Sequence, residues 1–128
     1  RESFTSSDIE LRSGKLLLNL VDLIYEFNPT QIFLYRSHKN EPVLDRLAEI
    51  LGSEYSFALP RIKSFKSGKM VFLKWEKSDL LMRNKFGLEE PVGQADELEP
   101  NSRTLVCVPA VALDRRGGRM GYGGGRVL

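Results

Sequence analysis

The chain has 128 residues, of which 41% are hydrophobic and 28% are charged, and these are ordinary proportions for a soluble globular protein. No apolar run reaches the 18 or so residues that a transmembrane helix needs, and no secretory signal pattern opens the chain. The formal net charge is +2, and residues 111–128 hold four arginines against one acid. This local positive charge favours a small anionic ligand over an extended nucleic-acid surface.

Cys107 is the only cysteine, so the chain cannot form an internal disulfide bond. The expected location is therefore the reducing cytoplasm. Cys107 lies within an apolar run, where a buried and inert thiol is favoured over a nucleophile.

A long amphipathic helix is predicted for the first quarter of the chain. Ser7 fits the N-cap of a capping box, with Glu10 three residues later. The apolar residues that recur behind it at helical spacing are Leu16, Leu20, Leu23 and Phe27. Asn28 and Pro29 end the helix, because the residue before a proline disfavours helical backbone angles.

Alternating strands and helices follow. Residues 31–35 form a short apolar strand, and Pro42 and Gly52 suit the first turn and the C-terminal stop of a second helix. Residues 55–59 form a second strand, which Pro60 closes. This alternation predicts an α/β fold with three layers, in which flanking helices cover a mostly parallel, open, Rossmann-like sheet.

The pattern changes in the second half of the chain. Residues 70–75 alternate loosely and predict an edge strand, while residues 77–85 are polar and irregular, with a short helical turn at residues 79–82. Residues 86–100 form an acidic loop flanked by prolines, and residues 105–109 return to a buried central strand.

The glycine-rich segment 117–125 follows this last strand. Glycine lets the backbone approach an anion closely, and Arg119 supplies a fixed charge. The segment matches neither a Walker A loop nor the dinucleotide fingerprint. Its composition alone leaves three interpretations open: a phosphate-binding loop, a tail without fixed structure, and an Arg/Gly segment that binds RNA.

Other candidate residues lie near predicted strand ends. Glu41 follows the first strand, at the edge where open α/β sheets bind ligands, although a carboxylate that only stabilises a helix start is the more common case. His38, the only histidine, is expected to be solvated. Three aromatic residues could line a pocket for a flat ring but are more often core residues: Phe72, Trp75 and Phe86.

Several of these pieces together resemble the 5-formyltetrahydrofolate cyclo-ligase family, also called methenyltetrahydrofolate synthetases. The family pattern Val-Pro-Gly-x-Ala-Phe-Asp, followed by Arg-Leu-Gly-x-Gly-x-Gly, is similar to residues 108–125. Residues 35–41, the Leu-Pro-Arg at 59–61 and residues 70–91 resemble its upstream segments. The likeness runs from about residue 5 to Gly125, and the order of four motifs makes it specific.

The resemblance implies ATP- and magnesium-dependent cyclisation of 5-formyltetrahydrofolate to 5,10-methenyltetrahydrofolate, with release of ADP and phosphate. It also implies that Glu41, Arg36 and Phe86 bind the folate substrate. The residues it places around the ATP phosphates are Arg119, Gly121, Tyr122, Gly123, Gly124 and Gly125. The expected partners are these two small molecules, with no membrane, no nucleic acid and a monomeric state.

The family pattern continues after the glycines with Tyr-Tyr-Asp, whose aspartate binds magnesium, and that position falls on Leu128 here. We therefore assign no metal-binding residue. We expect residues 1–128 to form a single partial domain, incomplete at both ends, whose activity is weak or absent. The alternative from another class is a non-catalytic nucleotide- or RNA-binding module that uses the Arg/Gly-rich segment.

Overall fold

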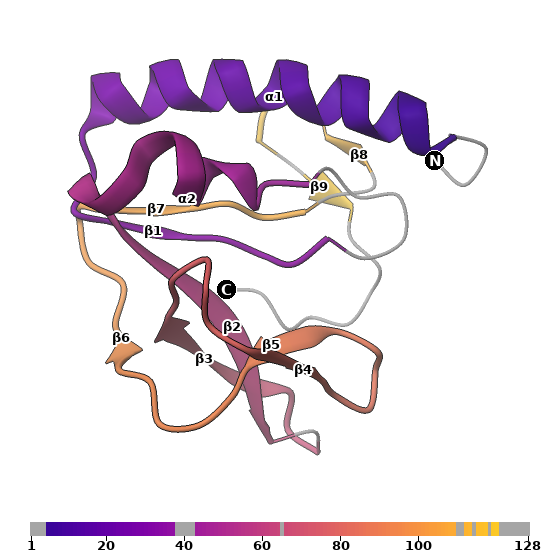
Figure 1. The fold of residues 1–128 in the computed structure, drawn as a ribbon, viewed down its shortest axis with the longest axis vertical. Coiled ribbons are helices and arrows are strands. Elements are labelled where there is room, and N and C mark those ends of the chain that lie inside the picture. Colours follow the sequence, from indigo (N-terminus) through magenta and orange to yellow (C-terminus); the bar gives the residue numbers. More distant parts are fainter. Residues whose placement is uncertain are drawn as a thin grey trace.

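The fold is an α/β arrangement, seen in a computed structural model that describes residues 5–37, 43–64, 66–109, 112–113, 115–117 and 119–120 (Figure 1). The helical elements are α1 (Ser6–Phe27), α2 (Arg46–Leu51) and the 3-10 turn η1 (Gly52–Glu54). The strands are β1 (Gln31–Phe33), β2 (Ser56–Ser64), β3 (Lys69–Lys74), β4 (Leu81–Arg83), β5 (Glu89–Pro91), β6 (Glu97–Leu98), β7 (Thr104–Val106), β8 (Ala112–Leu113) and β9 (Arg119–Met120).

The main sheet has five strands in the order β6-β3-β2-β1-β7. β1 pairs in parallel with both β2 and β7, whereas β3 pairs antiparallel with β2 and with β6. β4 with β5 and β8 with β9 form two short antiparallel pairs. The predicted α/β class with a parallel core is confirmed, and the β2–β3 hairpin makes the sheet mixed.

The N-terminus of α1 is capped by Thr5, and Ser7, which was predicted as the cap, lies inside the first turn. The Thr5 hydroxyl accepts from the Asp8 N–H at 3.2 Å, and the Asp8 carboxylate accepts from the Thr5 N–H at 3.2 Å. The Thr5–Asp8 pair therefore satisfies the capping box two residues earlier than predicted. The helix ends at Asn28, as predicted, with a left-handed φ of 51°.

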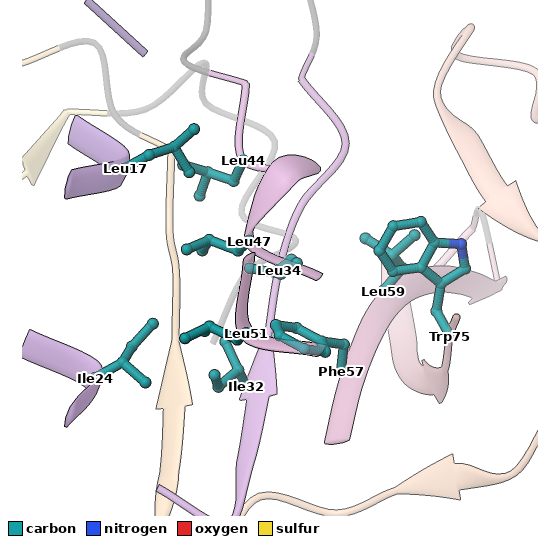
Figure 2. Packing of buried hydrophobic residues seen from close by; sticks show 10 residues of the cluster. All are labelled: Leu17, Ile24, Ile32, Leu34, Leu44, Leu47, Leu51, Phe57, Leu59 and Trp75. Carbon is teal, nitrogen blue, oxygen red and sulfur yellow. The ribbon is translucent and has the colours of Figure 1, made fainter. Parts of the chain in front are cut away.

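Both helices pack against one face of the sheet, where they build the larger hydrophobic cluster (Figure 2). Leu17 and Ile24 of α1 and Leu47 and Leu51 of α2 belong to this cluster, with Leu17 beside Leu44 in Figure 2. The other members are Ile32, Leu34, Leu44, Phe57, Leu59 and Trp75. A second helical layer, expected from the three-layer prediction, is not present among the described residues. Within those same ranges, neither helix is long and apolar enough to cross a membrane.

The opposite face of the sheet carries a smaller cluster. Successive residues of a strand point to opposite faces, so Phe33 lies opposite its neighbours Ile32 and Leu34. Phe33 is fully buried and its ring stacks on Phe72 with 4.4 Å between centroids, next to Ala58. The two faces of β1 are therefore both apolar, as expected for a central strand.

β2 runs through Pro60, which was predicted to end it. β1 ends at Phe33, opposite Ala58, so Pro60 lies beyond the pairing with β1. Trp75 N–H donates to the Phe57 carbonyl at 2.8 Å, and by alternation the nitrogen of Pro60 points away from β3. The missing N–H therefore costs no hydrogen bond to β3. The proline nitrogen faces the side of β1, where the bond from the Leu34 N–H to the Ala58 carbonyl at 2.8 Å comes just before it, and β2 continues paired with β3.

Four other predictions about elements need correction. The second helix begins at Arg46, and Pro42 lies outside the described residues. The helical turn predicted at residues 79–82 is wrong, because β4 forms there, and the predicted acidic loop contains β5 and β6. The last predicted strand forms as β7, but it is half-buried and lies at the edge of the five-stranded sheet. β4 and β5 are three-residue strands that pair with each other, whereas β6 and β7 pair with β3 and β1 from earlier in the chain.

Candidate functional site

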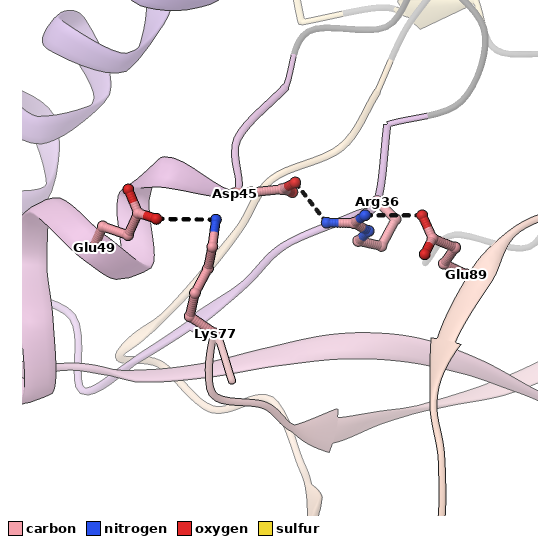
Figure 3. Close-up of polar contacts among 5 residues, drawn as sticks. All are labelled: Arg36, Asp45, Glu49, Lys77 and Glu89. Carbon is pink, nitrogen blue, oxygen red and sulfur yellow. Dashed lines mark hydrogen bonds and ion pairs between the residues drawn. The ribbon is translucent and has the colours of Figure 1, made fainter. Parts of the chain in front are cut away.

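Arg36 lies in the segment that follows β1, at the carboxyl end of a parallel strand, where ligands bind in open α/β sheets. Its Nη1 is 2.5 Å from Asp45 Oδ2 and its Nη2 is 2.8 Å from Glu89 Oε1 (Figure 3). Asp45 immediately precedes α2 and Glu89 begins β5. One guanidinium therefore joins β1, α2 and the β4–β5 hairpin.

Arg36 and Glu89 shift each other's pKa values. Burial by itself lowers the pKa of Arg36, but the hydrogen bond to Glu89 and the charges of Asp45 and Glu89 raise it above its ordinary value. The hydrogen bond from Arg36 lowers the pKa of Glu89. Arg36 Nε is buried and has no hydrogen-bond partner among the described residues. Both terminal nitrogens of Arg36 are thus bound to protein carboxylates, and the side chain is held in place.

A second ion pair joins α2 to the segment between β3 and β4. Lys77 Nζ lies 3.1 Å from Glu49 Oε1, and both side chains are about half exposed (Figure 3). Exposed pairs of this kind contribute little to stability. The contact nevertheless places the start of the β4–β5 hairpin beside α2.

Phe86 lies at the tip of the β4–β5 hairpin and is 41% exposed. Asn84 organises this turn: its Oδ1 accepts from the N–H groups of Phe86 at 2.8 Å and Leu88 at 3.1 Å. Its own N–H donates to the Leu88 carbonyl at 2.8 Å, and Gly87 has a φ of 80° that favours glycine. The turn therefore presents a partly exposed aromatic ring from a backbone whose N–H groups at residues 84, 86, 87 and 88 all donate hydrogen bonds.

Glu90 connects this turn to the main sheet. Its Oε2 accepts from Asn84 Nδ2 at 2.9 Å and from the Ile62 N–H of β2 at 2.7 Å. A groove of about 330 Å³ lies between β2 and the hairpin. Three cationic side chains line it, together with Glu90: Arg61, Arg83 and Lys85. The groove therefore has a positive balance of charge.

The structure places the predicted site residues unequally. It brings Arg36 together with the hairpin that carries Phe86, through Glu89. Glu41 and residues 121–125 lie outside the described residues, as does His38. The backbone of Arg119 pairs with Leu113 in the β8–β9 pair, and its side chain is not among those described.

Sequence reasoning did not identify Asp45, Asn84, Glu89 or Glu90. The two adjacent glutamates before Pro91 were the available signal, because charged residues that become partly buried usually have partners. Phe72 and Trp75 are buried in the core, as the more common interpretation predicted for isolated aromatic residues.

Neither a metal centre nor a reactive thiol emerges from the described part of the chain. There, no group of three or more His, Cys, Asp and Glu side chains could hold a metal ion. Burial raises the pKa of the Cys107 thiol to about 11, so the thiol is protonated at neutral pH. This environment agrees with the inert thiol expected for Cys107.

Comparison with known proteins identifies the family. The model of the 5-formyltetrahydrofolate cyclo-ligase family matches residues 5–126. The chain belongs to this family. The match covers almost the same range as the likeness predicted from the motifs, which ran from about residue 5 to Gly125.

Two curated cyclo-ligases are similar to the chain. The 5-formyltetrahydrofolate cyclo-ligase of Haemophilus influenzae is 29% identical over 107 residues, covering 82% of this chain and 57% of that protein. The Escherichia coli K12 protein of the same name is 35% identical over 68 residues, covering 52% and 37%. The matched region thus spans 57% of the first relative's length and 37% of the second's.

Solved structures agree with the family assignment. The NMR structure of Aquifex aeolicus 5,10-methenyltetrahydrofolate synthetase superposes with a TM-score of 0.78 at 25% identity, covering 94% of this chain and 60% of that one. The Mycoplasma pneumoniae synthetase has a TM-score of 0.71 at 20% identity, covering 97% and 65%, and shows the shared fold. The described strands and helices therefore follow the cyclo-ligase fold.

Proposed function

We propose that this chain supports the ATP-dependent cyclisation of 5-formyltetrahydrofolate to 5,10-methenyltetrahydrofolate, with release of ADP and phosphate. The observation that carries the proposal is the family match over residues 5–126, together with the fold shared with the Aquifex aeolicus synthetase. The proposed activity is that of relatives of which this chain covers 57% and 60%.

The proposed reaction has two steps. The γ-phosphoryl group of ATP passes to the formyl oxygen on N5, which leaves ADP. N10 then attacks the activated formyl carbon and loses its proton, and the carbon–oxygen bond breaks as phosphate departs with the formyl oxygen. Phosphoryl transfer needs mainly positioning and neutralisation of charge, which suits a site built from backbone N–H groups and arginine.

The described residues support a folate site at the carboxyl end of β1. Phe86 offers an exposed ring on which a flat pterin can stack. Arg36 is bound to two carboxylates, and we propose that it fixes the hairpin beside the substrate. The cationic groove near Phe86 suits the carboxylates of a folate tail. We also propose that Glu41 binds the substrate, as the family resemblance implies.

The nucleotide half of the site is proposed from the motif alone. We assign the ATP phosphates to Arg119 and residues 121–125, which include Tyr122. Magnesium would neutralise phosphate charge. The described residues offer no cluster that fits this ion, so no step of the proposed reaction is routed through it.

The decisive experiment is an absorbance assay for 5,10-methenyltetrahydrofolate, which absorbs in the near ultraviolet. It is run with 5-formyltetrahydrofolate, ATP and magnesium, and each is omitted in turn. Because the chain spans 57% of the Haemophilus influenzae relative, a fusion that supplies the remainder of that relative is assayed in parallel. Product formation that requires ATP supports the proposal. Absence of both turnover and folate binding in the two proteins overturns it.

We further propose that the protein acts as a monomer in the cytoplasm.

The family match favours the ligase over the alternative, an RNA-binding module built on the Arg/Gly-rich segment. The alternative predicts RNA affinity that falls steeply with salt and disappears when residues 115–126 are deleted. A titration with single-stranded RNA at low and high salt distinguishes the two functions.

A further inference from the structure

We propose that Asn84 and Glu90 form a positioning pair that sets the affinity for the folate substrate by holding the turn that carries Phe86. This role rests on the proposed function, because it assumes that Phe86 stacks on the folate. Neither residue needs to touch the substrate. Their effect passes through the backbone of residues 84–88.

The Asn84 side chain makes hydrogen bonds in two directions. Its Oδ1 fixes the Phe86 and Leu88 N–H groups, which sets the path of the turn. Its Nδ2 donates to Glu90 Oε2 at 2.9 Å, so the amide plane of Asn84 cannot turn without breaking a bond at one end. The orientation of the turn is therefore tied to the position of the Glu90 carboxylate.

Glu90 in turn is fixed to the main sheet. Its Oε2 accepts the Ile62 N–H at 2.7 Å, beyond the point where β1 stops pairing with β2. Hydrogen bonds to an ionised acceptor are stronger than neutral ones. The path from Phe86 through Asn84 and Glu90 to Ile62 thus holds an exposed aromatic ring at a fixed place relative to the sheet.

Other contacts hold the hairpin independently of the pair. β4 and β5 pair from Leu81 with Pro91 to Arg83 with Glu89. Arg83 Nη1 donates to the Gly87 carbonyl at 3.0 Å, and Glu89 is bound to Arg36. Removing the Asn84–Glu90 bond should therefore displace the turn and leave the hairpin folded. Small displacements of this kind reduce binding and catalysis strongly when a stacking geometry is required.

The test uses an exchange of groups between the two positions. Asn84→Asp keeps an acceptor for the Phe86 and Leu88 N–H groups but removes the donor to Glu90 and sets two carboxylates side by side. Adding Glu90→Gln restores the wild-type net charge, ends the repulsion between the two carboxylates and supplies a donor to the Asp introduced at position 84. Because both wild-type bonds end on Oε2, a Gln amide at position 90 that donates to this Asp from that place gives up the bond from the Ile62 N–H. Leu80→Ala, at a residue that is 77% exposed just before β4, is the matched control.

Three quantities are measured for each protein: the Kd for 5-formyltetrahydrofolate by calorimetry, the Kd for ATP, and amide hydrogen exchange at Phe86, Leu88 and Ile62. We expect Asn84→Asp to weaken folate binding about tenfold with ATP affinity unchanged and exchange at Ile62 accelerated. The double variant should recover folate affinity to within about threefold of the wild type while exchange at Ile62 stays accelerated, because the bond from the Ile62 N–H is not restored. Leu80→Ala should match the wild type. If Asn84→Asp fails to fold, Asn84→Ser replaces it and should show the same tenfold loss.

Folate affinity that is unchanged in Asn84→Asp overturns the positioning role and leaves the proposed function intact. Equal losses in the single and double variants also overturn it, because the coupling between the two side chains is then absent. If neither the wild-type chain nor the fusion binds 5-formyltetrahydrofolate or turns it over, the proposed function itself is overturned, and the positioning role with it.

Discussion

The guanidinium of Arg103 covers the ring of Phe27, with 4.9 Å between Cζ and the ring centroid, and one of its nitrogens donates to the Phe27 carbonyl at 2.6 Å. The same nitrogen donates to the Asn28 carbonyl. A cation thus lies over the C-terminus of α1, where the helix dipole is negative and the last carbonyls lack helical partners.

Replacing Arg103 with Ala should therefore lower the free energy of unfolding by roughly 1–2 kcal/mol, because it removes the ring contact and both carbonyl bonds. Urea denaturation followed by circular dichroism measures the change. Arg103→Lys keeps the charge without the planar fork and should recover only part of the loss. A variant as stable as the wild type would show that the contact contributes nothing.

We expect the ion pair between Arg36 and Glu89 to stabilise the protein at neutral pH and to lose this effect at acidic pH. Arg36 lowers the pKa of Glu89 in the folded state, so this pair stabilises the fold above the unfolded pKa of about 4.3 and is lost as the pH falls through the folded value. Glu89→Gln should therefore be less stable than the wild type at pH 7, with the difference shrinking below about pH 4. Thermal denaturation across this range tests the prediction, and a pH-independent difference would contradict it.

Two glycines should respond to alanine in opposite directions. Gly52 ends α2 with a φ of 62°, so Gly52→Ala should cost about 1 kcal/mol. Gly14 lies within α1, and a Cβ there meets nothing within 4 Å, so Gly14→Ala should add roughly 0.5–1 kcal/mol. Urea midpoints of the two variants should fall on either side of the wild type. The same sign for both would contradict the backbone assignment.

The Cys107 thiol should be unreactive in the folded protein. Burial raises its pKa to about 11, and only the thiolate attacks alkylating reagents. Iodoacetamide at pH 8 should label the native chain slowly and the urea-unfolded chain quickly. Because the folded pKa is raised, this group favours the folded state below the unfolded pKa of about 8.5, and the contribution is lost as the pH rises toward 11. Equal labelling rates in the two states would refute burial.

Phe86 should matter for binding and not for stability. The ring is 41% exposed, so Phe86→Ala should change the free energy of unfolding by less than about 0.5 kcal/mol. Loss of ring stacking should raise the Kd for 5-formyltetrahydrofolate about tenfold. Phe86→Tyr keeps the stacking face and serves as the control. Unchanged affinity in Phe86→Ala would remove this residue from the site.

Features encoded locally were predicted well. The length and end of α1 follow from a 3.6-residue apolar period and from Asn28 before a proline, and Gly52 stops α2 as expected. The α/β class follows from the alternation of strand and helix segments along the first half of the chain. The N-cap was misplaced because two overlapping pairs, Thr5 with Asp8 and Ser7 with Glu10, both fit a capping box, and the structure forms the first of them.

Features that depend on distant partners were missed. β4 and β5 are segments of only three residues that pair with each other, and the bond between Glu90 and Ile62 that ties them to the main sheet joins residues 28 apart. Similarly, Arg36 was identified as a substrate contact, but its two carboxylate partners come from other elements. A single sequence shows that these charged residues are present but not which of them form ion pairs in the fold.

The parallel pairing of β1 with β7 has a consequence for how the protein is made. β1 is complete at Phe33, yet its second neighbour begins at Thr104. During synthesis, α1, α2 and the β1–β2–β3 core can assemble while the later chain is still absent. The edge of β1 that pairs with β7 stays unpaired until β7 has been synthesised. Contacts of such long sequence separation form slowly. A nascent chain paused before Thr104 should therefore expose a backbone edge that chaperones can recognise.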